Sequence, residues 1–311
     1  MRQPPPLRNF PNYPVTGGTI LFALAVSVPK FAGMDISAFI LDGHAMHGQP
    51  WRFITSTLPH GDVLHLAFNL LWTWSFGTLV EEALGGLRTA MLFLLFAVVP
   101  LAAEFAILDG GIGLSGVGYG LFGLLWILST RNPRFLGAID PQTVKLFIGW
   151  FFFCVVATKL GFMNVANIAH GVGALCGILA GLALSPVNRE RILGATGLAA
   201  LTALTFAGAG PLRPVVNVSP RGFAMPFELG VEAYQAKRFE DSARFFEEAR
   251  AMSPNEAATY YDLGLALERS GRREEAGRAF LTAVRLAPDD EKYRDAAEPW
   301  IERAPATSPE K

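Results

Sequence analysis

Charged residues are scarce in this sequence and unevenly distributed. Only 17% of its 311 residues are charged, against about 25% in a typical soluble domain, while 51% are hydrophobic. Charge is sparse from about residue 15 to residue 210 and abundant from residue 221 onward. The formal net charge of −1 disfavours nucleic-acid binding. The sequence therefore predicts a membrane-embedded part followed by a soluble part.

Cysteine is nearly absent. Cys154 and Cys176 lie in apolar runs, where a free cysteine packs as a small hydrophobic residue. Two cysteines cannot make a paired-cysteine zinc site, and the five histidines show no ligand spacing with them. The sequence therefore predicts no zinc site of this kind. We also expect no cleavable signal peptide, because no small-residue cleavage pattern follows the first apolar segment.

The apolar part divides into seven runs, each close to the roughly 20 residues that a membrane-spanning helix needs. The runs are residues 15–33, 63–81, 88–108, 114–130, 144–162, 165–186 and 192–210. Residues 34–62 mix aromatic and polar side chains, which suits a loop at the membrane interface. The predicted fold class is all-α: a polytopic membrane helical bundle followed by a small soluble helical domain.

Positive charge in the short loops predicts the orientation of the chain. The loops on one side carry Arg2, Arg8, Arg88, Arg131, Arg134, Lys145, Arg189 and Arg191, whereas the other side has only Lys30, Arg52 and Lys159. We expect an N-terminus in the cytoplasm and a chain in the cell (inner) membrane. Seven spans would then leave the tail after residue 210 on the non-cytoplasmic side.

The charged tail contains an internal repeat with a period of 34 residues. The recurring positions are Leu229-Gly230 with Leu263-Gly264, Pro254 with Pro288, and Ala243 with Gly277. This pattern resembles tetratricopeptide repeats, in which each unit is a helix hairpin. We expect units at 227–254 and 261–288 and a closing helix at 291–303. The repeats would either act as a spacer or bind a protein or peptide partner.

Four polar residues fall at a similar depth in three runs that cross in the same direction. His65 and Asn69 are near the start of the second run, Ser115 opens the fourth, and His170 is about one and a half turns into the sixth. A polar residue inside a span costs roughly a few kcal/mol, so it invites a functional explanation. All four are therefore expected to form one site just below the outer surface.

Small residues predict a close crossing between the runs that carry Ser115 and His170. They recur at intervals of four: Gly116 and Gly120 in the fourth run, and Ala169, Gly173, Gly177 and Gly181 in the sixth. This spacing lets helix backbones approach closely in lipid. The crossing could bring the Ser115 hydroxyl within hydrogen-bond reach of the His170 imidazole.

The residue types then predict a nucleophile and its base. Ser115 needs a base to take its proton, and His170 is the candidate, later serving as acid for the leaving amine. No carboxylate is suitably placed to complete a catalytic triad, because Asp62 and Asp109 are in loops and Glu104 is in the third run. A two-member dyad is therefore expected. Tyr119, one turn after Ser115, either holds the His170 ring or simply packs.

Donors for a developing oxyanion are also at hand. His65 and Asn69 are four residues apart and share one helix face, and both side chains can donate. The Ser115 backbone N–H, at a helix N-terminus, adds a third donor and a favourable dipole. The loop histidines His44, His47 and His60 are assigned local hydrogen bonds, and Glu81 is assigned a structural role.

Several motifs resemble the rhomboid family over residues 15–186. They are Gly113-Leu114-Ser115-Gly116, His65-Leu-Ala-Phe-Asn69, Ala169-His170-Gly-Val-Gly173 with Gly177, and Trp51-Arg52. The resemblance implies an intramembrane serine endopeptidase that cuts transmembrane segments with a Ser–His dyad, without metal or cofactor. It implies oxyanion roles for Asn69 and His65 and supporting roles for Gly113, Gly116 and Gly173.

The seventh span and the repeats depart from the six-helix core and resemble a "six plus one" arrangement. The expected domains are an N-terminal segment (1–14), a protease core (15–186), an extra span (187–210), a linker (211–226), repeats with a capping helix (227–303) and a disordered tail (304–311). The resemblance also implies that the substrates are membrane proteins whose transmembrane segment unwinds easily near its outer end, with a small residue before the cut.

Two alternatives remain open from the sequence. One is a catalytically inactive rhomboid-like binder of transmembrane segments, although such relatives usually lack the serine or the histidine. The other is a transporter or channel, which tends to show repeats and interrupted helices within its membrane part. A soluble-type serine hydrolase is disfavoured, because Val117 occupies the position where its nucleophile motif needs glycine.

Overall fold

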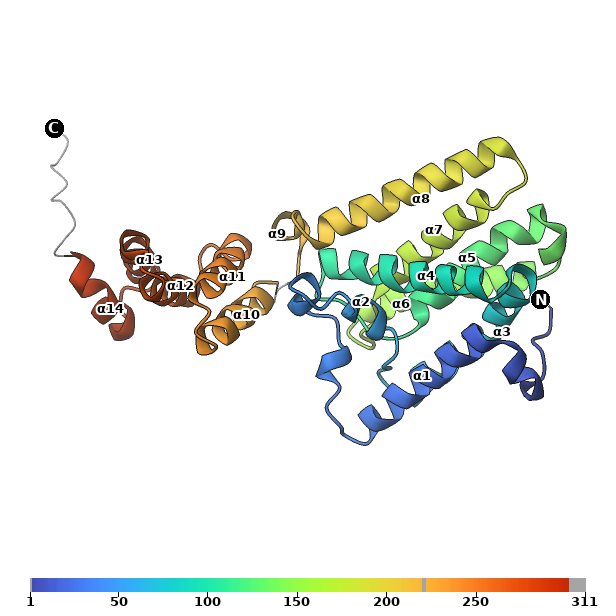
Figure 1. The fold of residues 1–311 in the computed structure, drawn as a ribbon, viewed down its shortest axis with the longest axis horizontal. Coiled ribbons are helices and arrows are strands. Elements are labelled where there is room, and N and C mark those ends of the chain that lie inside the picture. Colours follow the sequence, from blue (N-terminus) through green and yellow to red (C-terminus); the bar gives the residue numbers. More distant parts are fainter. Residues whose placement is uncertain (1, 220–221, 302–311) are drawn as a thin grey trace. The chain divides into compact units, whose positions relative to one another are not determined.

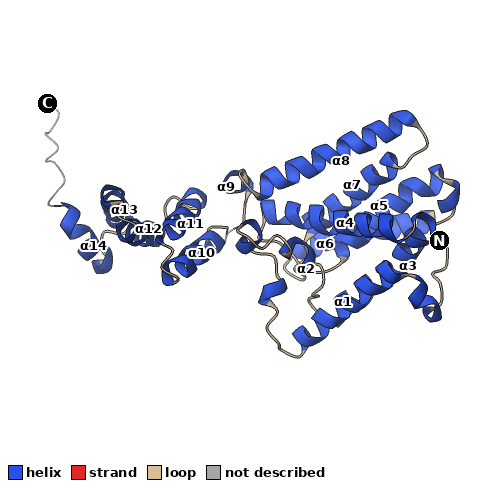
Figure 2. Ribbon diagram, viewed as in Figure 1, coloured by secondary structure: helices blue, strands red, loops and turns tan. Residues whose placement is uncertain are grey.

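The computed structural model describes residues 2–219 and 222–301, and each regular element in these ranges is a helix (Figures 1 and 2). The expected all-α fold class is confirmed. The chain forms two compact units that divide between Val216 and Asn217. The predicted disordered tail at 304–311 and the last two residues of the predicted closing helix lie outside the described residues.

Seven long helices make up most of the first unit. They are α1 (Pro14–Phe31), α3 (Val63–Leu84), α4 (Gly86–Ile107), α5 (Ser115–Arg131), α6 (Pro141–Lys159), α7 (Asn167–Ala183) and α8 (Asn188–Ala209). Among the described residues, α1, α3, α4, α6 and α8 are long and apolar enough to cross a membrane. Helices α5 and α7 have 17 residues each, about 26 Å, which is shorter than a hydrocarbon core of about 30 Å. Crossing by these two helices stays a prediction.

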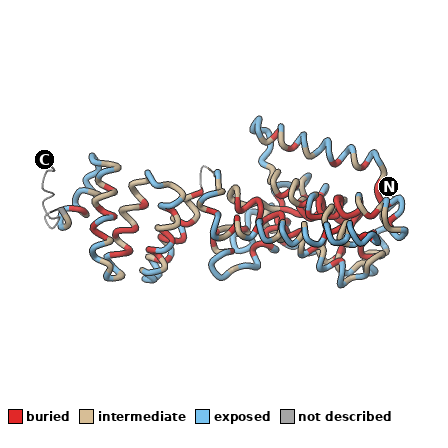
Figure 3. The backbone as a smooth tube through the Cα atoms, turned by 90° about the horizontal axis from the view of Figure 1, so that it is seen from above, coloured by how far each residue is buried: buried red, intermediate tan, exposed pale blue. Residues whose placement is uncertain are grey.

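Helix α7 lies against α5, α4 and α8, and small residues allow the close approach to α5. A Cβ atom added to Gly177 would lie 2.0 Å from the carbonyl oxygen of Gly120, and one added to Gly123 would lie 2.3 Å from that of Ala174. Any side chain at these glycines would push the two backbones apart. Figure 3 shows buried residues concentrated in the interior of this unit.

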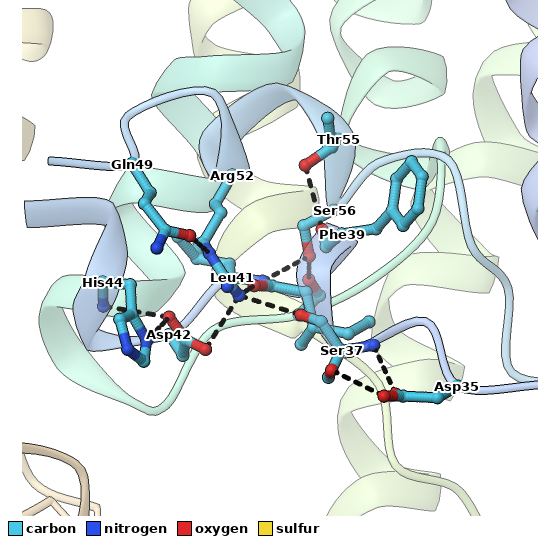
Figure 4. A network of polar contacts seen from close by, with 12 residues as sticks. Asp35, Ser37, Phe39, Leu41, Asp42, His44, Gln49, Arg52, Thr55 and Ser56 are labelled. Carbon is cyan, nitrogen blue, oxygen red and sulfur yellow. Dashed lines mark hydrogen bonds and ion pairs between the residues drawn. The ribbon is translucent and has the colours of Figure 1, made fainter. Parts of the chain in front are cut away.

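The segment between α1 and α3 is an ordered loop that includes the short helix α2 (Arg52–Thr55). Arg52 is only 7% exposed. Its Nη1 donates to the carbonyl oxygens of Ser37 (2.8 Å) and Ile40 (2.7 Å) and to Oδ2 of Asp42 (2.9 Å), and its Nε donates to Oε1 of Gln49 (2.7 Å) (Figure 4). One guanidinium thereby links four residues of the loop.

The turn after α8 is attached to the end of α4. In α9 (Arg213–Val216), the Arg213 Nε donates to the carbonyl oxygen of Phe105 (3.1 Å), and the guanidinium lies 4.3 Å from the Phe105 ring centroid. Its Nη2 is 3.8 Å from Oδ1 of Asp109. Asp109 belongs to the loop that leads to Ser115. The end of α8 and the start of α5 therefore lie at the same end of this unit.

Helix hairpins build the second unit, which is described separately. Its helices are α10 (Ala224–Gln235), α11 (Phe239–Met252), α12 (Ala257–Arg269), α13 (Arg273–Leu286) and α14 (Glu291–Ile301). A Cβ on Gly230 would lie 2.7 Å from the Phe246 ring, and one on Gly264 would lie 2.6 Å from the Phe280 ring. The same glycine–phenylalanine contact thus recurs after 34 residues, as the sequence period predicts.

Candidate active site

Ser115 is the first residue of α5 and is half-buried. The backbone N–H groups of a first helical turn have no acceptor within the helix. The loop before Ser115 is held by Ser56, a residue that is fully buried. The Ser56 hydroxyl donates to the carbonyl oxygen of Gly111 (2.6 Å), and its own carbonyl oxygen accepts from the N–H of Gly113 (3.1 Å).

Gly113 can only be glycine in this geometry. Its φ of +103° lies in the left-handed region that L side chains rarely adopt. A Cβ atom here would also lie 2.8 Å from Cε1 and 3.1 Å from Nε2 of His65. The structure thus brings Gly113 and His65 together, two residues that the sequence assigns to one site.

His65 and Asn69 occupy the first turns of α3. The His65 Nδ1 accepts from the N–H of Gly61 (3.2 Å), so a neutral ring carries its proton on Nε2, the nitrogen nearer to Gly113. Asn69 is buried, and its Nδ2 donates to the carbonyl oxygen of His65 (2.9 Å). The side-chain amide of Asn69 has a second N–H, which this hydrogen bond does not use.

His170 is 4% exposed and lies in the first turns of α7. The ring of Tyr119 stacks on it, with centroids 4.6 Å apart and 26° between the planes. The Tyr119 hydroxyl donates to the carbonyl oxygen of Phe147 in α6 (3.2 Å), which fixes the tyrosine. Of the two roles that the sequence allows for Tyr119, the geometry favours holding the imidazole.

The helix ends that carry Ser115 and His170 face each other. A Cβ atom on Gly173, one turn after His170, would lie 2.6 Å from the carbonyl oxygen of Gly116, the residue after Ser115. Within the described residues, no hydrogen bond joins Ser115 to the His170 ring, and His170 Nδ1 is buried without a partner. The dyad contact itself therefore stays a prediction.

His60 has a larger role than the sequence predicts. The ring is fully buried, and its Nε2 accepts from the N–H of Leu114 (3.2 Å), the residue before Ser115. The proton of the neutral ring is then on Nδ1, which is 2.9 Å from the carbonyl oxygen of Leu58. Burial, with a smaller effect from the neighbouring His65, lowers the pKa of His60 to about 3.

Sequence reasoning missed three buttressing residues, namely Ser56, His60 and Glu104. Each holds a backbone segment that is distant along the chain, at separations of 55, 54 and 65 residues. No local motif marks such contacts; a signal is available only for Glu104, which is a carboxylate inside an apolar run. Among the described residues, no group of three His, Cys, Asp or Glu side chains could hold a metal ion.

The fold and site define a multi-pass membrane protein with a polar site at the ends of its inner helices. Comparison with known families makes this specific. Residues 47–187 match the rhomboid domain, and residues 233–298 match the tetratricopeptide repeat. These two regions are thus similar to a rhomboid domain and to tetratricopeptide repeats, the same two families that the sequence motifs resemble.

Individual relatives agree with the domain match. The chain is similar to proteins named rhomboid protease GlpG from three bacteria. Identity is 33% over 155 residues with the protein of Enterobacter sp. (strain 638), 48% of this chain and 54% of the relative. Identity with the protein of Pectobacterium atrosepticum is 32% over 175 residues, which are 52% of this chain and 61% of the relative. Identity with the protein of Serratia proteamaculans is 34% over 174 residues, which are 53% of this chain and 61% of the relative. The matched region thus covers less than two thirds of each relative.

Proposed function

We propose that this protein is an intramembrane serine endopeptidase in which Ser115 is the nucleophile and His170 its base. The observation that carries the proposal is the stacking of Tyr119 on His170 beside the crossing of Gly116 and Gly173. It supports a fixed imidazole next to the helix turn that begins with Ser115. The rhomboid domain match and the protease names of the relatives point to the same chemistry.

The proposed reaction begins when His170 takes the hydroxyl proton of Ser115. The serine oxygen attacks the peptide carbonyl carbon, and the electron pair of the C=O bond moves to the oxygen. His170 then gives its proton to the leaving amine as the C–N bond breaks. Water, deprotonated by the same imidazole, releases the acyl group and restores Ser115.

The oxyanion of each tetrahedral intermediate would be held by three donors. Asn69 Nδ2 and His65 Nε2 donate from α3, and the Ser115 N–H donates from the start of α5. The position of Nε2 near Gly113 supports the His65 assignment. The helix dipole of α5 adds a favourable field at the same place.

Substrates are proposed to be membrane proteins with a transmembrane segment that unwinds near its outer end and has a small residue before the cut. We propose that the N-terminus is cytoplasmic and that the repeats are on the non-cytoplasmic side. The attachment of Arg213 to Phe105 supports only that α8 ends at the Ser115 end of the first unit, and the orientation itself rests on the loop charges. The repeats would recruit a protein or peptide partner.

The test is cleavage of a generic transmembrane substrate by the purified full-length chain in liposomes. The parent should release two fragments, whereas Ser115→Ala and His170→Ala should release none while remaining folded. Fragment masses would identify the cut bond. A Ser115→Ala protein with full activity would overturn the proposal, and a parent that binds the substrate without cutting it would support the inactive alternative.

A further inference from the structure

Helix α7, which carries His170, lacks a cap from its own sequence. Its N-cap position is Ala166, whose methyl side chain cannot accept a hydrogen bond. The first backbone N–H groups of a helix need acceptors, usually from a Ser, Thr, Asp or Asn at this position. Inside a membrane protein, where water is scarce, leaving them without acceptors is costly.

A carboxylate from another helix fills this role. Glu104 of α4 is 2% exposed, and its Oε2 accepts from the N–H of Ala169 (2.8 Å). The cap therefore comes from a residue 65 positions earlier in the chain.

This cap acts on the turn that holds the proposed base. Ala169 directly precedes His170, and the N–H of His170 bonds to the carbonyl oxygen of Ala166 (3.2 Å). Glu104 thus fixes the backbone of the first turn, while Tyr119 fixes the ring. The negative charge of the Glu104 carboxylate also interacts favourably with the positive N-terminal end of the α7 dipole.

We infer that Glu104 is a positioning residue for His170, holding the start of α7 so that the imidazole keeps its place beside Ser115. This inference rests on the proposed function. In this role Glu104 transfers no proton. What the position requires is an oxygen atom that can accept the backbone N–H of Ala169. A loss of alignment near 1 Å can cost on the order of 10²-fold in rate.

The chain contains a matched control for a purely structural effect. Glu81 of α3 caps a different helix in the same manner, because its Oε1 accepts from the N–H of Val15 (2.9 Å) and its Oε2 from the N–H of Thr16 (2.9 Å). Glu81 thus contacts the start of α1, which is consistent with the structural role expected from the sequence. Glu81 is near the end of α3 that is opposite to His65.

The experiment compares Glu104→Met, Glu104→Gln, Glu104→Asp and Glu81→Met with the parent and Ser115→Ala in liposomes. Each protein is assayed for thermal unfolding, for kcat and KM, and for covalent labelling of Ser115 by a fluorophosphonate. Glu104→Met should lower kcat by about 10- to 100-fold with little change in KM. Glu104→Gln should recover most of kcat, because its amide oxygen can accept the same N–H.

The remaining variants distinguish the position of the acceptor oxygen from the charge of the carboxylate, and both of these from a general loss of stability. Glu104→Asp keeps the charge but is one methylene shorter, so it should lose kcat although Gln does not; this comparison stands even if the Met variant does not fold. Glu81→Met should lower the unfolding temperature and leave the kcat of the folded fraction unchanged. Parent-like kcat in Glu104→Met or Glu104→Asp, or an equal loss in Glu81→Met, would overturn the inference. A parent no more active than Ser115→Ala would instead defeat the proposed function, and the inference with it.

Discussion

The ring of Tyr119 in α5 lies almost parallel to the ring of His170 in α7, with centroids 4.6 Å apart. The tyrosine is itself tied to α6 through the carbonyl oxygen of Phe147. An imidazole that must accept and return a proton needs a fixed orientation. This stack therefore connects the packing of three helices to the chemistry proposed for His170.

Two substitutions of Tyr119 distinguish the effect of its stacked ring on cleavage from the effect of its hydroxyl. Tyr119→Phe keeps the stack and loses one hydrogen bond, so we expect near-parent cleavage and about 0.5–1.5 kcal/mol lower stability. Tyr119→Leu removes the stacked ring, so kcat should fall by about tenfold or more. Steady-state cleavage and thermal unfolding in micelles measure both effects. Equal kcat values for the two variants would argue against a role for the stack.

Asn69→Ala tests the oxyanion assignment. Removal of one donor typically costs about 10²–10³ in kcat, so cleavage should be slow but measurable. The Ser115 N–H and His65 remain as donors, and Ser115→Ala should be far less active. Single-turnover cleavage at saturating substrate gives the rate directly. Parent-like turnover in Asn69→Ala would remove this residue from the oxyanion site.

The crossing of α5 and α7 predicts opposite outcomes for two glycines. In Gly177→Ala the new methyl group would meet the carbonyl oxygen of Gly120 at 2.0 Å, so the helices must separate. We expect a loss of about 1–3 kcal/mol in unfolding free energy, with reduced cleavage. Gly118 has no atom within 4 Å of an added Cβ, and Gly118→Ala should preserve stability. Similar unfolding temperatures for both variants would contradict the close crossing.

Burial of His60 makes stability depend on pH. The unfolded chain binds a proton at His60 around its ordinary value of 6.5, whereas the folded state does so only near pH 3. The unfolded state therefore holds more protons between these values, and stability falls as the pH drops from about 6.5 toward 3. The His60 contribution is about 1.4 kcal/mol per pH unit. Unfolding titrations at pH 7, 6, 5 and 4 should give a shallower decline for His60→Asn than for the parent, and parallel declines would refute this account.

The repeats should be accessory to the chemistry. Since the first unit contains every residue proposed for the reaction, deletion of residues 221–311 should leave cleavage of a generic transmembrane substrate intact. The choice among natural substrates should change if the repeats recruit a partner. Fragment analysis of membranes from cells with the full or shortened chain measures this. Loss of generic cleavage in well-folded shortened protein would contradict the accessory role.

Local patterns predict the helices well. The expected run at 114–130 corresponds to α5 (Ser115–Arg131), because continuous apolar character defines a helix wherever it is long enough. The 34-residue period likewise anticipates the equivalent contacts of Gly230 and Gly264 with phenylalanine rings. In such cases the determining residues are close in sequence or repeat at a fixed interval.

The site was harder to predict where its contacts are distant in sequence. Their similar depth groups His65, Asn69, Ser115 and His170 from the sequence, and this grouping stays a prediction. The dependence of Leu114 on His60 could not be anticipated, because a histidine in a polar loop resembles many locally bonded ones. The sequence offers no reason to expect Glu104 at the start of α7, because capping of α7 depends on how α4 packs against it.

The cap of α7 also has a consequence for biosynthesis. Glu104 emerges from the ribosome long before Ala169, so the first turn of α7 cannot acquire its acceptor until the sixth long helix has been made and docked on α4. Until then His170, the proposed base, has no fixed place next to Ser115, the proposed nucleophile. A half-synthesised chain in the membrane would accordingly remain unable to cut its neighbours, and competence would arrive only with completion of the bundle.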